Sequence, residues 1–333
     1  MYKVSILPIC AILLLTGCSV SPNPANSISS SPEANQEAAT ALTDAQIDAL
    51  IRSTPQEKTL ESLKKHFMAI DVAASYLEPF EIEYTKGPTA DQSKVDQVVD
   101  KFSEKLKMYQ LLGLDSLDQD WVLASEKDYK WWVDFRLAQD PSFPVSTWNE
   151  QANELGHCGL SAGVFCGAGN ALNGVVYQDN VVGTAFSGRG LDYVSRHEAA
   201  HFYQAVFGYG GRCWTAEGQA TFFETYLESS SRHRAEIISQ LKASETGVAK
   251  LSESELLDRL TNDQICQGDS NIAYDLGMLS YEYLYLNFSF LDVHNLQVLS
   301  SSQGWEKAVP QALSIEASEL NAQLASYIFT ETR

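Results

Sequence analysis

The chain has 333 residues, of which 44% are hydrophobic, and a formal net charge of -20 at pH 7. A field of this sign repels phosphate groups, which argues against nucleic acid and anionic lipid head groups as partners. A solvated acidic surface that keeps the protein soluble is the simplest interpretation of the charge, and a preference for cationic substrates is the alternative.

The first residues are typical of an export signal. Lys3 supplies a positive charge, and the apolar run 6–15 is too short to span a bilayer and leads into Leu-Thr-Gly-Cys at 15–18. These four residues resemble the bacterial lipobox, which implies a signal peptide over 1–17 and lipid attachment at Cys18. Ser19 stands where an inner-membrane retention aspartate would, so the resemblance implies an outer-membrane lipoprotein, periplasmic or surface-facing. An ordinary cleaved signal peptide with an incidental cysteine is the alternative.

Residues 18–42 are predicted to be a flexible tether, because they are rich in Ser, Pro, Asn and Ala and have no hydrophobic period. About 290 residues follow, which is enough for one large domain or a catalytic core with a helical appendage. The first part, 43–118, is predicted to be helical. Apolar residues recur on one face from Thr43 onward, over 56–77 and over 95–112.

Four cysteines follow the tether: Cys158, Cys166, Cys213 and Cys266. An even number in an exported chain indicates disulfides, and four cysteines allow three pairings. We favour Cys158 with Cys166, which closes a short glycine-rich loop, and Cys213 with Cys266. A cysteine-type zinc site is the alternative, although Cys-x-x-Cys spacing is absent.

The middle of the chain, 119–270, is predicted to contain strands before its main helices. The apolar run 121–124 and the residues 174–178 suit buried strands. Ser125 with Asp128 resembles a capping pair for the helix that follows the first strand.

Two helices are expected next. The first runs over 191–207, with inward positions at intervals of three and four residues, and stops at a glycine-rich segment, 208–211. The second begins with Thr215 as its N-cap and continues to about 228.

The helix over 191–207 carries His-Glu-Ala-Ala-His at 197–201. Residues four apart lie one helical turn above each other, so His197 and His201 can share one metal ion. Glu198 is offset by about 100 degrees, which leaves it beside the metal as a general base that holds water. The pattern also arises by chance in about one per cent of chains this long, and its histidines are then merely hydrogen-bonded.

A tetrahedral catalytic zinc ion needs a third protein ligand and one open position. A third histidine in an extended motif is excluded, because Gln204 and Phe207 occupy the places of its glycine and histidine. Glu217, in the opening turn of the next helix, is the first acidic residue after the motif. An ordinary acidic residue favoured by a helix N-terminus is the alternative interpretation of Glu217.

These residues resemble the gluzincins, the thermolysin and aminopeptidase N-type metallopeptidases. Their Glu-Gly-x-Ala signature, with a second glutamate seven residues on, is matched by Glu217, Gly218, Ala220 and Glu224. The resemblance implies zinc (Zn²⁺) as cofactor, Glu217 as third ligand and Glu224 as a supporting residue on the same face. It also implies that Gly218 lets the two helices of the metal site approach closely. Ala216 departs from the pattern, since many relatives have asparagine there.

Two further segments resemble parts of the same superfamily. In the Tyr-x-x-Gly segment 274–277, the resemblance implies that Tyr274 donates a hydrogen bond to the developing oxyanion. A core tyrosine in an aromatic-rich helix is the alternative. The strand at 174–178 resembles the edge strand that pairs with an extended peptide.

The predicted fold class is α+β. A zincin-like catalytic core, a small mixed sheet plus the His-Glu-x-x-His helix, is expected over 119–270, between added N-terminal helices and a helical C-terminal subdomain over 271–333. The predicted function is a zinc metallopeptidase with a peptide or protein substrate, held as a monomer at the membrane by its lipid anchor. A zinc hydrolase of non-peptide amides or esters, and a catalytically inactive zinc-binding or peptide-binding envelope lipoprotein, are the alternatives.

Overall fold

The computed structural model describes residues 42–116, 120–125, 128–139, 141, 164–165, 172–177, 190–208, 211–227, 234–243, 248–266 and 271–333, and these are mostly helical. The predicted signal peptide, the tether with its lipidation site Cys18, and the pair Cys158 and Cys166 lie outside them. No helix in the described ranges is long and apolar enough to cross a bilayer.

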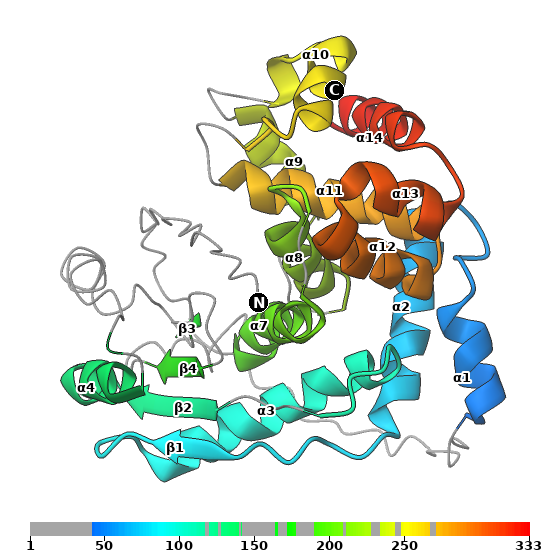
Figure 1. Ribbon diagram of the computed structural model, residues 1–333. Coiled ribbons are helices and arrows are strands. Elements are labelled where there is room, and N and C mark those ends of the chain that lie inside the picture. The colour runs from blue at the N-terminus through cyan, green and yellow to red at the C-terminus, as the bar shows by residue number, and fades with distance from the viewer. Residues whose placement is uncertain are drawn as a thin grey trace, which may run out of the picture.

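The N-terminal part consists of helices α1 (Asp44–Ile51), α2 (Leu60–Ser75) and α3 (Gln92–Gln110) (Figure 1). Thr43 caps α1 through a reciprocal pair of hydrogen bonds with Gln46. Helix α2 begins later than predicted, because the Thr59 hydroxyl accepts from the Ser62 N–H and so takes the N-cap position.

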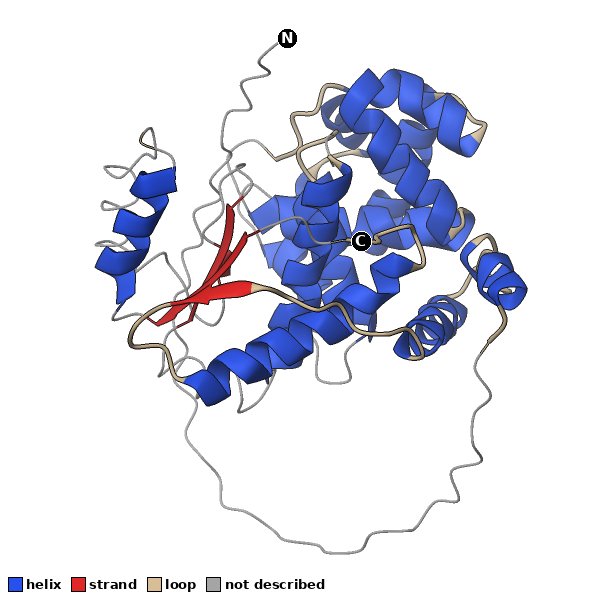
Figure 2. Ribbon diagram, turned by 60° about the horizontal axis from the view of Figure 1, so that its bottom comes forward, coloured by secondary structure: helices blue, strands red, loops and turns tan. Residues whose placement is uncertain are grey.

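A small mixed sheet lies at one side of the helices (Figure 2). Its strands lie in the order β1 (Tyr84–Lys86), β2 (Asp120–Ser125), β4 (Leu172–Tyr177) and β3 (Val164–Phe165). The first three are parallel, and β3 is antiparallel to β4. Strand β1 falls in a region predicted to be helical; three residues are too few to display the alternation that marks a strand.

Two predictions about the sheet were wrong. Strand β4 covers most of the segment 174–178, but its residues Val175 and Val176 pair with β2 on one side and β3 on the other, so they are not at an edge. Ser125 is the last residue of β2, where it pairs with Tyr177, so it does not stand directly before the helix that follows. Helix α4 (Tyr129–Gln139) begins four residues later.

Helix α7 (Gly190–Phe207) carries the His-Glu-x-x-His motif and ends at Gly208, whose φ of 68° lies in the left-handed region that glycine adopts without strain. Helix α8 (Thr215–Leu227) follows after a short turn. Thr215 is already inside α8, and its hydroxyl donates to the carbonyl of Arg212 at 2.7 Å instead of capping the helix. The remaining helices are α9 (Arg234–Ala243), a short 3-10 turn at Val248–Lys250, α10 (Glu253–Thr261), α11 (Asn271–Asn287), α12 (Phe290–Gln303), α13 (Trp305–Leu313) and α14 (Ala317–Glu331).

One hydrophobic cluster joins the N-terminal helices, α7, α8 and the C-terminal helices. Phe67 of α2 packs edge-on against Phe222 of α8 at 5.2 Å between ring centroids and against Tyr285 of α11 at 4.7 Å. Phe102 of α3 packs against Phe202 of α7 in the same way. Each aromatic pair contributes about 0.5–1.5 kcal/mol beyond the area it buries. Helices α7 and α8 are therefore held from both sides by the same core.

A buried carboxylate ties the C-terminal helices together. Glu282 of α11 has no exposed surface, and both of its oxygens accept from Arg234 of α9 at 2.7 Å. The hydroxyls of Tyr226 on α8 and Tyr327 on α14 donate to it as well. Because a buried charge requires such partners, these contacts fix how four helices meet.

Candidate metal centre

Helices α7 and α8 bring the three predicted ligands to one point. The Nε2 atoms of His197 and His201 are 3.2 Å apart, and Oε2 of Glu217 lies 3.3 Å from each. In the described part of the chain, this is the one group of three histidine, cysteine or acidic residues whose ligand atoms lie within 4.8 Å of one another. The three side chains keep 14–25% of their surface exposed, so the cluster is mostly buried.

The size of this triangle suits a tetrahedral zinc ion. Zinc holds nitrogen and oxygen ligands at about 2.0–2.1 Å, and a regular tetrahedron of that radius has edges of about 3.3 Å. The edges observed here are 3.2–3.3 Å. Three protein ligands also leave the fourth corner for water or substrate, as in catalytic zinc sites.

The outer nitrogen of each imidazole faces an oxygen acceptor. Nδ1 of His197 lies 2.9 Å from Oε2 of Glu224, and Nδ1 of His201 lies 2.9 Å from Oε1 of Gln204. When Nδ1 donates, Nε2 keeps its lone pair, which is the form that binds a metal. Two imidazole lone pairs and a carboxylate oxygen then converge, and such a donor set could hold a cation at its centre.

No family model matches this chain, and no curated protein or solved structure matches it either. The chemistry of the cluster therefore carries the functional interpretation.

The carboxylates around the cluster favour a positive charge there. Burial lowers the pKa of His197, but Glu224 and Glu217 outweigh it and the pKa is raised well above 6.5. Burial also opposes protonation of His201, and Glu217 again raises the pKa above 6.5. The same carboxylates that hold protons on the imidazoles would hold a divalent ion in their place.

Glu198 lies beside the triangle, as expected for the residue after the first histidine. Burial raises the pKa of its carboxyl group, and the imidazoles of His197 and His201 oppose the shift. Its Oε2 atom is buried and has no hydrogen-bond partner among the described residues. A buried carboxylate oxygen of this kind is available to a molecule that binds in the cluster.

Tyr274 reaches the cluster from α11. Its ring stacks on that of His197 with centroids 6.0 Å apart and planes 15° apart. It is partly exposed, whereas Tyr281 and Tyr285 on the same helix are fully buried, so Tyr274 lies at the site and not in the core. Burial and the carboxylates of Glu217 and Glu198 raise its pKa, which keeps the phenol protonated as a donor at neutral pH.

Close packing of two glycines explains how Tyr274 gets there. A Cβ on Gly218 would lie 2.4 Å from Cα of Gly277. Gly218 does allow a close helix approach, but the expected partner was wrong: the backbone it meets is that of α11, not α7. Because Gly277 lies one turn beyond Tyr274, this contact sets Tyr274 beside Glu217.

The predicted Cys213–Cys266 disulfide is present and also supports the site. It joins the segment just before α8, which carries Glu217, to the segment that leads to α11, which carries Tyr274. The backbone N–H of Cys213 donates to Asp263 at 3.0 Å, which fastens the same junction a second time.

The isolated histidines in the described ranges are not at this site. His294 is 8% exposed, and its Nδ1 shares a hydrogen bond with the Tyr203 hydroxyl. Burial lowers its pKa to about 4, so it is a neutral core residue. His66 is partly buried on α2, and its pKa is also lowered by burial.

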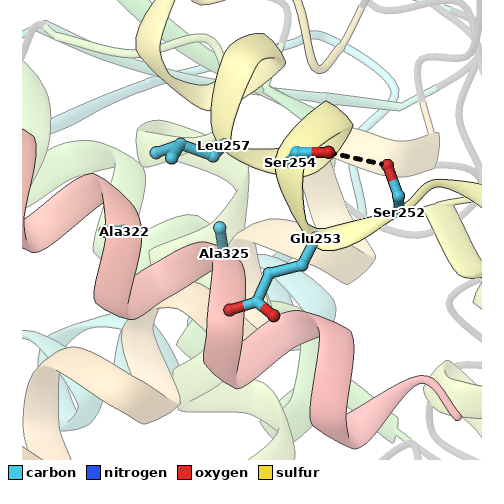
Figure 3. Close-up of a pocket in the computed structure, with 6 residues that line it drawn as sticks. All are labelled: Ser252, Glu253, Ser254, Leu257, Ala322 and Ala325. Carbon is cyan, nitrogen blue, oxygen red and sulfur yellow. Dashed lines mark hydrogen bonds between the residues drawn. The ribbon is translucent and has the colours of Figure 1, made fainter.

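A surface hollow between α10 and α14 lies away from the metal centre (Figure 3). It is lined by Ser252, Glu253, Ser254, Leu257, Ala322 and Ala325. The hydroxyl of Ser252 caps α10 and lies 3.1 Å from that of Ser254. Because the Ser252 hydroxyl is used in capping α10, we assign no chemistry to this hollow.

The sequence prediction missed Gln204, which it used only to exclude an extended histidine motif. Gln204 follows His201 by three residues on α7, a spacing that places two side chains on the same helical face. That spacing was the available signal. What the sequence could not supply is the partner from α8, the carbonyl of Ala216, which accepts from the Gln204 amide at 3.0 Å.

Proposed function

We propose that this protein is a zinc-dependent hydrolase, specifically a metallopeptidase of the gluzincin type with a zincin-like core. The observation that carries the proposal is the triangle of His197, His201 and Glu217, with edges that match a tetrahedral zinc ion. The Glu198 carboxylate, whose Oε2 has no hydrogen-bond partner among the described residues, and the Tyr274 phenol border this triangle. These are the two further groups that amide hydrolysis by activated water needs.

Zinc, when bound by these three residues, would supply a Lewis acid that lowers the pKa of water towards 7 and polarises the substrate carbonyl. Glu198 then accepts a proton from the attacking water, and its raised pKa makes it a better base near neutrality. Attack on the carbonyl carbon forms a carbon–oxygen bond and moves the carbonyl pi electrons onto its oxygen as an oxyanion. The amide carbon–nitrogen bond breaks afterwards, as the carbonyl re-forms and Glu198 returns the proton to the leaving amine. Tyr274 donates a hydrogen bond to the oxyanion, which strengthens as negative charge develops.

The substrate is proposed to be a peptide or protein. A lipid anchor at Cys18 would hold the enzyme at the outer membrane as a monomer, with the tether carrying the domain away from the lipid. This part of the proposal depends on the sequence signals in residues 1–42.

The Glu198→Gln variant tests the proposal directly. It should retain one zinc ion per chain while hydrolysis of a fluorescent peptide library falls by at least about a thousandfold, since the general base is removed. Glu316→Gln, on an exposed glutamate that makes no capping hydrogen bond, is the matched control and should keep full activity. In the wild type, a chelator should abolish turnover and added zinc should restore it.

Each alternative function has its own outcome in this experiment. Wild-type protein that binds zinc but cleaves esters or small amides, and no peptide, would be a hydrolase of another class. Stoichiometric zinc with no turnover of any substrate would indicate an inactive binding protein. Full peptide hydrolysis by Glu198→Gln would falsify the assignment of the base.

A further inference from the structure

Gln204 is a buried polar residue whose three hydrogen-bonding groups are all engaged. It is 5% exposed. Its Nε2 donates to the carbonyl of Ala216 and to Oε1 of Gln219, both at 3.0 Å. Its Oε1 lies 2.9 Å from Nδ1 of His201. The side chain thus links the His201 imidazole on α7 to two groups on α8.

These contacts determine which way round the amide lies. The Ala216 carbonyl can only accept, so the group that faces it must be the NH2 of Gln204. The amide oxygen is thereby turned towards His201, and only an Nδ1–H can satisfy it. When His201 is neutral, it is then the tautomer whose Nε2 carries a lone pair, directed at His197 and Glu217.

We propose that Gln204 is the positioning residue for His201, selecting its metal-binding tautomer and fixing its ring, as Glu224 does for His197. The inference rests on the proposed zinc site and goes beyond it, because it assigns a role to a residue outside the ligand set. The two supports differ in charge: Glu224 is a carboxylate, whereas Gln204 is neutral. The carboxylates at the cluster are therefore those of Glu198, Glu217 and Glu224. The neutral amide that supports His201 adds no fourth negative charge.

If Gln204 served only to hold α7 against α8, replacing its hydrogen-bond partner Gln219 should weaken the site as much as replacing Gln204 itself. Gln219 is 1% exposed, accepts from Gln204 and donates to the Tyr285 hydroxyl at 3.2 Å. Replacing it removes one of the two hydrogen bonds that Gln204 makes to α8 and leaves the other, to the Ala216 carbonyl. Gln219 is therefore the matched control for Gln204.

The test compares Gln204→Met with Gln219→Met, which make the same near-isosteric change at neighbouring buried positions. Zinc affinity, measured by competition with a chromophoric chelator, should fall by about 10–100-fold in Gln204→Met and stay within about threefold of wild type in Gln219→Met. Thermal unfolding of the metal-free proteins should show similar losses of stability for the two. Long-range nitrogen–proton spectra should lose the Nδ1–H signature of His201 in Gln204→Met alone.

The outcomes separate this inference from the proposed function. Equal zinc affinity in Gln204→Met and wild type, or an equal loss in Gln219→Met, would overturn the role of Gln204 while leaving the zinc site standing. Wild-type protein that binds no zinc would overturn both. A selective loss in Gln204→Met would support the role even if no substrate were hydrolysed.

Discussion

Gly218 and Gly277 lie so close that a methyl group on the first would be 2.4 Å from the Cα of the second. No side chain fits between α8 and α11 at this level, and the contact is made between backbones. Since Glu217 precedes one glycine and Tyr274 lies a turn before the other, the contact sets the distance between a proposed ligand and the proposed oxyanion donor.

Gly218→Ala should therefore destabilise the protein. An alanine in place of a helical glycine ordinarily stabilises by about 1 kcal/mol. Here the added carbon meets backbone atoms that cannot move alone, so we expect a loss of about 1–3 kcal/mol from overpacking. Urea unfolding of Gly218→Ala and Gly277→Ala measures the change in the free energy of unfolding. Its sign shows whether helix propensity or overpacking dominates, and a gain in stability in both variants would contradict the close contact.

Glu217 and Glu224 lie on the same helix, and their substitution should separate a ligand from its support. Glu217→Ala removes one side of the triangle, and stoichiometric zinc binding should be lost. Glu224→Ala removes only the acceptor of the His197 Nδ1–H, so zinc should still bind, about 10–100-fold more weakly. Zinc titration with atomic absorption of the dialysed proteins measures both, and the reverse order would make Glu224 the third ligand.

Zinc affinity should fall as the pH is lowered, because protons compete for both imidazoles. The nearby carboxylates raise the pKa values of His197 and His201 above 6.5 in the metal-free protein. Competition therefore begins above pH 6.5 and strengthens below it, by up to about tenfold per imidazole for each pH unit. Dissociation constants measured between pH 5.5 and 8.5 test this, and a flat profile would show that the histidines are not ligands.

How much of this site the sequence predicts depends on how far apart the contacting residues lie in the chain. His197, Glu198 and His201 share one helix, where spacing alone fixes their geometry. The assignment of Glu217 as third ligand depended on the resemblance to gluzincins, because the turn between α7 and α8 determines whether Glu217 reaches the histidines. The spacing of Gln204 from His201 placed the two side chains on one helical face. Its hydrogen bond to the Ala216 carbonyl and the partner of Gly218 could not be foreseen, since each depends on which backbone of another helix packs against the residue.

The sheet illustrates the same limit at the level of the fold. Strand β2 has the continuous apolar pattern of a buried strand and was predicted. Strands β1 and β3 have three and two residues, which is too short for a pattern, and their pairing depends on the neighbours that the tertiary fold provides. Because β3 was missed, β4 was wrongly expected to be an edge strand.

The network around Glu282 gives a prediction about stability that is separate from the metal centre. Glu282→Ala removes the acceptor of Arg234, Tyr226 and Tyr327. The Arg234 side chain, which is 21% exposed, keeps an ion pair with Glu331. Breaking a buried ion pair from one side costs about 3–5 kcal/mol. Chemical denaturation should show a loss of this size.

The exposed Glu319→Ala on α14 is the control for Glu282→Ala and should cost no more than about 1 kcal/mol, since Glu319 lies in the first turn of the helix. A loss below about 1 kcal/mol in Glu282→Ala would mean that the four helices do not depend on the carboxylate.

Removing the Cys213–Cys266 disulfide should affect both stability and the metal centre. The bond closes a loop with a sequence separation of 53, and loss of a native disulfide costs about 2–5 kcal/mol. Because it joins the segments that precede Glu217 and Tyr274, its loss also frees the start of α8 relative to α11. The glycine contact between these helices remains, so the double variant Cys213→Ser with Cys266→Ser should fold but bind zinc more weakly than wild type. Calorimetry and zinc titration of the double variant test the two effects separately, and unchanged affinity would show that the glycine contact alone holds Glu217 in place.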